Sequence, residues 1–77
     1  MPRYFFHTRY KRFTPDDEGL ELPDLSSAWR QTSEMAGQVL HDLDGKLEPG
    51  REWRVDVADE VGKVLFALRF SAEFYDV

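Results

Sequence analysis

The sequence predicts an α+β fold in which a single helix packs on one face of a small, mainly antiparallel sheet. Residues 52–70 contain two stretches in which apolar side chains alternate with other side chains, which is the period of a β-strand. Residues 25–43 have apolar side chains three and four positions apart, which is the period of an α-helix. Because 77 residues leave room for one core only, we expect one domain over residues 1–77, with the order strand, short strand, helix, strand, strand.

The first strand is expected over Arg3–Tyr10, where aromatic and β-branched residues dominate. Strand alternation assigns one face to Tyr4, Phe6, Thr8 and Tyr10, and the opposite face to Arg3, Phe5, His7 and Arg9. The segment Pro15–Gly19 has the composition of a turn. A short strand over Gly19–Leu22 is then expected to return beside the first strand.

The helix is expected to begin after Asp24, because an aspartate there accepts hydrogen bonds from the free N–H groups of the first turn. Its apolar face comprises Leu25, Ala28, Trp29, Thr32, Ala36, Val39, Leu40 and Leu43. Gly37 weakens a helix and so indicates a close approach to the sheet. Gly45 is expected to end the helix as a left-handed cap, before a loop that contains Pro49 and Gly50.

The last two strands are expected to form an antiparallel hairpin over Glu52–Ala58 and Val64–Phe70. The segment Asp59–Lys63 between them suits a tight turn, with a glycine at its strained position. Beyond the hairpin, the alternatives for Ser71–Val77 are a short packed tail and an extension of the last strand, with Phe74 and Tyr75 as the packing side chains.

A single helix covers one face of a sheet, so the opposite face is expected to be open. Apolar side chains would lie there among charged ones, an arrangement suited to docking another protein. The candidate interaction residues on this face are Phe5, His7, Arg9, Arg54, Leu65, Ala67 and Arg69, and Asp56 is expected on the same face. An exposed sheet edge is a second candidate, because strand addition needs only backbone N–H and C=O groups.

Charge is unevenly distributed along the chain. Residues 1–12 contain four basic and no acidic side chains, whereas residues 13–25 contain five acidic and no basic ones. If the two segments are neighbours in the fold, these charges compensate each other locally. The net charge of −5 argues against nonspecific binding to phosphate backbones, so nucleic acid is not an expected partner.

The residue inventory excludes several classes of chemistry. The chain has no cysteine, which excludes a disulfide framework, a thiolate zinc site, an iron–sulfur cluster and a thiol nucleophile. The two histidines, His7 and His41, do not have metal-binding spacing, and the acidic residues between 16 and 21 do not alternate as calcium ligands do. The five glycines form no phosphate-binding loop, and no hydroxyl residue lies in a nucleophile motif. We therefore assign no catalytic, metal or cofactor residue and expect no cofactor.

No apolar run approaches the roughly 18–20 residues that span a bilayer, and the first residues do not have the apolar stretch of a secretory signal. We therefore expect a cytoplasmic protein with no membrane partner.

Three segments carry a resemblance to a known family. Met1–Phe6 (Met-Pro-Arg-Tyr-Phe-Phe), Asp17–Leu25 (Asp-Glu-Gly-Leu-Glu-Leu-Pro-Asp-Leu) and Trp53–Glu60, followed by Gly62, resemble a family of small uncharacterised bacterial proteins, a domain of unknown function. The resemblance runs nearly end to end and implies a fold but no activity. The chain departs from the family at Tyr10–Phe13, where it replaces a more polar turn.

A weaker resemblance connects Pro23-Asp24-Leu25 to antitoxins of the HicB type, in which a small sheet precedes a helix introduced by a similar segment. This resemblance implies a protein partner rather than a substrate. It does not extend to the additional DNA-binding module that such antitoxins often carry.

The main functional hypothesis is a non-enzymatic protein-interaction module, either a homodimer or a subunit of a complex, including a regulatory or antitoxin-like role. One alternative is a small-ligand binder or minor enzyme that uses His7, Arg9 and the acidic turn. Another alternative is a regulator that contacts nucleic acid through the basic first strand, where arginines and aromatic residues are interleaved.

Overall fold

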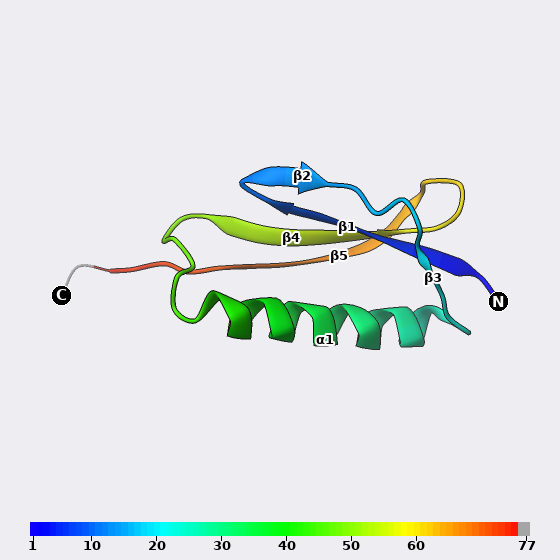
Figure 1. Ribbon diagram of the computed structural model, residues 1–77, viewed down its shortest axis with the longest axis horizontal. Helices are drawn as coiled ribbons and strands as arrows, with labels where there is room; N and C mark the ends of the chain where they lie inside the picture. Colours follow the sequence, from blue (N-terminus) through cyan, green and yellow to red (C-terminus); the bar gives the residue numbers. More distant parts are fainter. Residues whose placement is uncertain (76–77) are drawn as a thin grey trace.

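The computed structural model describes residues 1–75 and contains one helix beside a five-stranded sheet (Figure 1). In chain order the elements are β1 (Arg3–Tyr10), β2 (Arg12–Thr14), β3 (Leu20–Glu21), α1 (Leu25–Leu43), β4 (Glu52–Ala58) and β5 (Val64–Ser71). The α+β class is confirmed, with a sheet whose strand pairs are all antiparallel. Asp76 and Val77, the end of the segment left open by the sequence, lie outside the described residues.

The strands pair in the order β2-β1-β4-β5, and β3 pairs with the start of β1. The bounds of β1 and β4 agree with the prediction, and β5 extends through Ser71. Phe74 and Tyr75 do not pack against the domain: both are exposed, and the chain there runs away from the sheet (Figure 1). Phe74 and Tyr75 therefore cover neither face of the sheet.

The first turn was predicted wrongly. We expected residues 15–19 to reverse the chain, but it already reverses at Lys11, which has a φ of 66° and precedes the unpredicted strand β2. Lysine rarely adopts this left-handed conformation, so no local signal marks the position. Residues 15–19 form a loop that leads from β2 to β3.

The helix begins as predicted, with the Asp24 carboxylate accepting from the N–H of Ser27 at 2.8 Å. Its end differs: Asp44, at φ 48°, is the left-handed cap, and Gly45 follows it with φ 78°. The expectation for Gly37 is also wrong, because a Cβ built on this residue would meet nothing within 4 Å. Gly37 lies about 100° around the helix from the buried Ala36, is exposed and faces away from the sheet.

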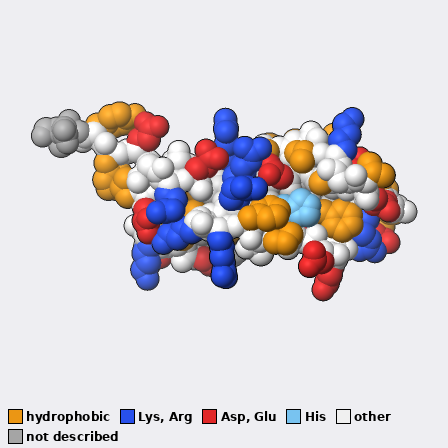
Figure 2. Space-filling model, turned by 90° about the horizontal axis from the view of Figure 1, so that it is seen from above, with side chains coloured by type: hydrophobic (Ala, Val, Ile, Leu, Met, Phe, Trp, Pro, Cys, Tyr) orange, Lys and Arg blue, Asp and Glu red, His pale blue; other side chains and the backbone are white. Residues whose placement is uncertain are grey.

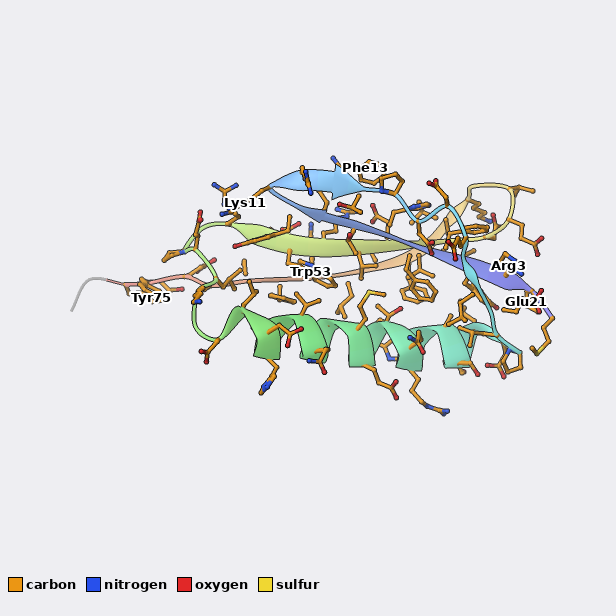
Figure 3. The ribbon with its side chains drawn as sticks, viewed as in Figure 1. Arg3, Lys11, Phe13, Glu21, Trp53 and Tyr75 are labelled. Atoms are coloured by element: carbon orange, nitrogen blue, oxygen red, sulfur yellow. The ribbon has the colours of Figure 1, made fainter. Side chains whose placement is uncertain are left out.

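The core lies between α1 and one face of the sheet. Its buried side chains are Tyr4, Phe6, Ala28, Thr32, Ala36, Trp53, Val55 and Val57. Figure 3 shows Trp53 in the layer between the sheet and the helix. The apolar helix face is wider than its contact with the sheet, so Leu25, Trp29 and Leu40, which we expected in the core, are about half exposed.

Candidate functional site

The sheet face turned away from α1 carries the seven candidate interaction residues. Phe5, His7 and Arg9 alternate along β1, Arg54 lies on β4, and Leu65, Ala67 and Arg69 lie on β5. Figure 2 looks onto this side of the molecule and shows a histidine between hydrophobic side chains, with basic side chains gathered beside it. We call this surface the open face.

Strand register aligns three arginines across the open face. Arg9 of β1 is paired with Arg54 of β4, which is paired in turn with Arg69 of β5. Directly paired residues in antiparallel strands have Cβ atoms about 4.5–5.5 Å apart, and like charges at such positions destabilise a sheet. We call these three residues the arginine row.

The arginine row contains little compensating negative charge. Arg54 donates through Nε to Oδ1 of Asp56 at 2.7 Å. Within residues 1–75 no ion pair involves Arg9 or Arg69, and both are exposed. The row thus presents two uncompensated guanidinium groups on a protein whose net charge is −5.

An aromatic cluster adjoins the arginine row. The rings of Phe5 and His7 stack with centroids 6.4 Å apart, and the ring of Phe13 lies 6.0 Å from that of His7. The guanidinium carbon of Arg9 lies 4.8 Å from the centre of the Phe13 ring, a cation–π contact. Phe13 is 48% exposed and lies on the side of the sheet away from α1 (Figure 3).

Phe13 also lies on the open face, where its sequence pattern did not place it. The residue belongs to β2, which was not predicted, and its pairing with Arg9 depends on the turn at Lys11. The aromatic character of Phe13 directly after the two basic residues Lys11 and Arg12 was visible, but its strand and its face were not.

The acidic loop, residues 15–19, is hydrogen-bonded to His7 through Asp16. The backbone N–H of Asp16 donates to Nδ1 of His7 at 3.0 Å, so Nδ1 acts as the acceptor in this contact. The Asp16 carboxylate accepts from the backbone N–H groups of Phe6, Glu18 and Gly19, each at 3.1 Å. The carboxylate therefore serves the backbone between β2 and β3 and does not contact the imidazole as a catalytic partner would.

These hydrogen bonds lower the pKa of Asp16 and so make the stability of the fold depend on pH. Burial raises the pKa of Asp16, but the backbone N–H groups of Gly19, Phe6 and Glu18 together outweigh burial and hold the pKa below its ordinary value of 3.8. A carboxyl group whose pKa is lower in the folded state stabilises the protein above its unfolded pKa. This contribution is lost as the pH falls through the folded pKa.

We expect Asp16→Asn to flatten the acid side of the stability profile. Between about pH 4 and pH 2, the free energy of unfolding should fall less steeply for this variant than for the wild type. Urea titrations followed by circular dichroism at several pH values measure the slope. Asp17→Asn, a matched change at an exposed neighbour, should retain the wild-type slope, and equal slopes in all three proteins would refute the role of Asp16.

Other charged residues pair outside the arginine row. Nη2 of Arg3 contacts Oε1 of Glu21 at 2.9 Å, and Nη1 donates to the Glu18 carbonyl, so the predicted compensation between the basic and acidic segments is confirmed for Arg3. His41 lies in the last turn of α1, where it suits the helix dipole. Among residues 1–75, no three potential metal ligands of the His, Cys, Asp or Glu type gather at one place.

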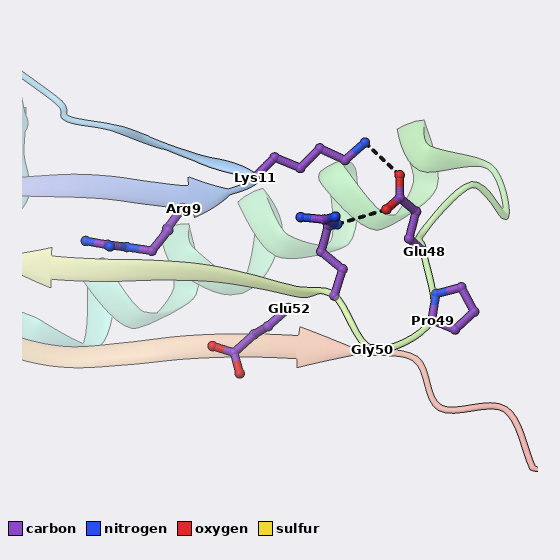
Figure 4. Close-up of a pocket in the computed structure, with 7 residues that line it drawn as sticks. Arg9, Lys11, Glu48, Pro49, Gly50 and Glu52 are labelled. Carbon is purple, nitrogen blue, oxygen red and sulfur yellow. Dashed lines mark hydrogen bonds and ion pairs between the residues drawn. The ribbon is translucent and has the colours of Figure 1, made fainter.

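A polar cleft of about 490 Å³ adjoins the arginine row at the end of the sheet where the β1–β2 turn meets the loop before β4. Arg9 is shared between the row and the cleft. In the cleft, Glu48 contacts Nζ of Lys11 at 2.7 Å and Nε of Arg51 at 2.9 Å (Figure 4). Hydrogen bonds from Lys11 and then Arg51 lower the pKa of Glu48, which keeps this carboxylate charged. Glu48 thereby occupies the other basic groups of the cleft and leaves Arg9 available.

Comparisons with known proteins give a family but no activity. A family model described as a domain of unknown function (DUF6894) matches residues 3–71. No curated protein and no solved structure matches the chain. Within residues 1–75 the structure has no helix with the length and apolar character needed to cross a membrane.

Proposed function

This chain belongs to the DUF6894 family of domains of unknown function, and we propose that it acts as a non-enzymatic protein-interaction module whose open face binds an acidic segment of a partner protein. The observation that carries the proposal is the arginine row, in which Arg9 and Arg69 have no acidic partner within residues 1–75.

Paired like charges cost free energy in the isolated domain, and an acidic partner that contacts the row converts that cost into attraction. Arginine forms bidentate hydrogen bonds with carboxylates, which gives such contacts a defined geometry. The partner recognised in this way carries Asp or Glu side chains spaced to follow neighbouring strands.

The aromatic cluster supplies the apolar part of the contact. Phe13 is half exposed, and Phe5 on β1 and Leu65 and Ala67 on β5 add apolar side chains to the open face. Aromatic and arginine side chains are enriched in the central parts of protein interfaces. An antitoxin-like role, in which the partner is a toxin protein, is one form of this proposal.

Affinity capture from the native host with charge-reversed variants tests the proposal. We expect the wild-type domain to retain a partner protein that Arg9→Glu and Arg69→Glu each bind about 10-fold less well or worse. Lys63→Glu is the matched control, since it makes the same charge change in the β4–β5 turn, outside the open face, and should retain the partner.

The outcomes separate the proposal from its alternatives. Equal retention of every captured protein by all four domains would contradict it. Nucleic acid also contains negative charge and stacking surfaces, so a fluorescent single-stranded oligonucleotide is tested in parallel. Tight oligonucleotide binding that Arg9→Glu abolishes and added salt weakens, without a captured protein, would replace the proposed partner with nucleic acid.

A further inference from the structure

A second surface of the domain is formed by the free edge of β5 and the adjoining flank of α1. It is separate from the core side of the helix and is not covered by any other element within residues 1–75. β5 is an edge strand of eight residues that has a neighbouring strand only on its β4 side. Its sequence contains one charged residue, Arg69, and no proline, so it has few of the features that protect sheet edges from pairing.

The flank of α1 beside this edge is apolar and exposed. Trp29 contacts Phe66 of β5 edge-to-face with ring centroids 5.4 Å apart, and a mainly apolar groove of about 360 Å³ lies between them and Leu25. Leu40 follows Trp29 by about three helical turns and therefore occupies the same flank. Leu25, Trp29 and Leu40 are each about half exposed.

We propose that a second copy of this chain covers this surface, with the two β5 strands paired antiparallel about a two-fold axis perpendicular to the sheet. The two sheets then form one continuous sheet, and both helices lie on the same side of it. Both open faces lie on the opposite side, so the dimer leaves Arg9 and the aromatic cluster available to the partner proposed above and shares only Arg69 with that interaction; Arg9→Glu therefore tests the partner alone.

Helix spacing supports a second copy as the occupant. Because α1 makes most of its contacts with β4 and β5, its axis lies near the boundary between these strands. Neighbouring strands are about 4.8 Å apart. Measured across the sheet, the helix axis therefore lies about 2.4 Å from β5 on the β4 side, and the two-fold axis lies about 2.4 Å from β5 on its free side. The two helix axes are then about 10 Å apart, within the range of directly packed helices. Pairing of the strands therefore also brings the exposed helix flanks into contact.

The charges of Arg69 and Asp56 favour one register for the pairing of the two β5 strands. With Leu68 opposite Leu68 of the second copy, Arg69 lies opposite Ala67 of the second copy, and that Ala67 is paired with its own Asp56. Arg69 and Asp56 of the second copy are then two strand spacings apart, about 10 Å between Cα atoms, with only an alanine methyl group between them. Arg69, which forms no ion pair within residues 1–75, thus comes within reach of a carboxylate that Arg54 of the second copy contacts through one oxygen, Oδ1.

The same register also fits the helices. The centre of the pairing, at Leu68, lies two residues or roughly 7 Å along β5 from Phe66, which contacts Trp29. Along the helix, 7 Å corresponds to about four residues beyond Trp29. The symmetry axis therefore passes near Ser33. Trp29 of each copy faces the region of Gly37 and Leu40 of the other, where a Cβ built on Gly37 would meet nothing within 4 Å, so that a large side chain has room.

Sedimentation of the full chain tests the dimer. We expect a mass of about twice 9.0 kDa at micromolar concentrations. Leu40→Lys should raise the dissociation constant at least about 100-fold, because it removes two apolar contacts per dimer. Leu20→Lys on β3 is the matched control, since Leu20 is 41% and Leu40 52% exposed, and this variant should remain dimeric.

Cysteine crosslinking tests the register in a chain that has no cysteine of its own. Leu68→Cys should form a disulfide-linked dimer on mild oxidation, because directly opposed Cα atoms about 4.5–5.5 Å apart suit a disulfide. Ser71→Cys should not, because the two Ser71 positions would be about 20 Å apart. A wild-type chain that stays monomeric to near-millimolar concentration would overturn the proposal. So would a dimer that Leu40→Lys does not weaken, or crosslinking through Cys at 71 but not at 68.

Discussion

Replacing Trp53 with alanine is expected to lower the midpoint of urea denaturation sharply. Trp53 is 4% exposed and stacks on Phe70 with ring centroids 5.0 Å apart. Removing such a side chain from a core costs about 3–5 kcal/mol. A domain of this length has a free energy of unfolding on the order of 4–12 kcal/mol, so the loss is a large fraction of the total.

Trp29→Ala is the matched control for this prediction. Trp29 is 49% exposed, so the same substitution should cost only about 1–2 kcal/mol. Urea denaturation followed by far-ultraviolet circular dichroism, at one dilute protein concentration, measures both values. Similar losses for the two variants would show that α1 does not cover the face that contains Trp53.

Replacing Gly19 with alanine is expected to have the next largest effect. Gly19 has a φ of 72°, and a Cβ at this position would lie 2.9 Å from the Tyr4 carbonyl oxygen and 2.8 Å from Cγ of Arg3. The left-handed conformation costs an alanine about 1–2 kcal/mol, and overpacking against backbone adds about 1–3 kcal/mol. We therefore expect a total loss of about 2–5 kcal/mol in the free energy of unfolding.

Gly62→Ala separates the two components of that loss. Gly62 has a φ of 85°, but a Cβ there would meet nothing within 4 Å, so only the conformational cost applies. The difference between the two variants in urea denaturation gives the cost of crowding at Gly19. If the variants lose equal stability, the acidic loop does not pack closely on β1, and the position of Asp16 beside His7 loses its support.

Local patterns predicted the elements whose side chains contact the core. Alternation over 52–58 and helical spacing over 25–43 depend on which side of each element is buried, and both segments fold as expected. The turn at Lys11 and the cap at Asp44 were missed because each places a residue other than glycine at positive φ, which neighbouring contacts must stabilise.

For the candidate site, the sequence predicted only which face of the sheet carries each residue. Alternation along β1, β4 and β5 placed Arg9, Arg54 and Arg69 on the same side of the sheet. Their alignment into one row depends on strand register, which the sequence of a single strand does not contain. The exposure of Trp29 and Leu40 was missed for a similar reason, because it depends on how far α1 lies from the edge of the sheet.

The central claim is that α1 covers one face of the sheet and leaves the other open. Nuclear magnetic resonance with a soluble paramagnetic probe measures this directly in the full chain. We predict strong relaxation of the side-chain protons of Phe13 and Leu65 on the open face, and weak relaxation of the methyl groups of Val55 and Val57 beneath the helix. If Phe13 and Leu65 prove as protected as Val55, the face is closed in solution, and it cannot be the binding surface proposed here.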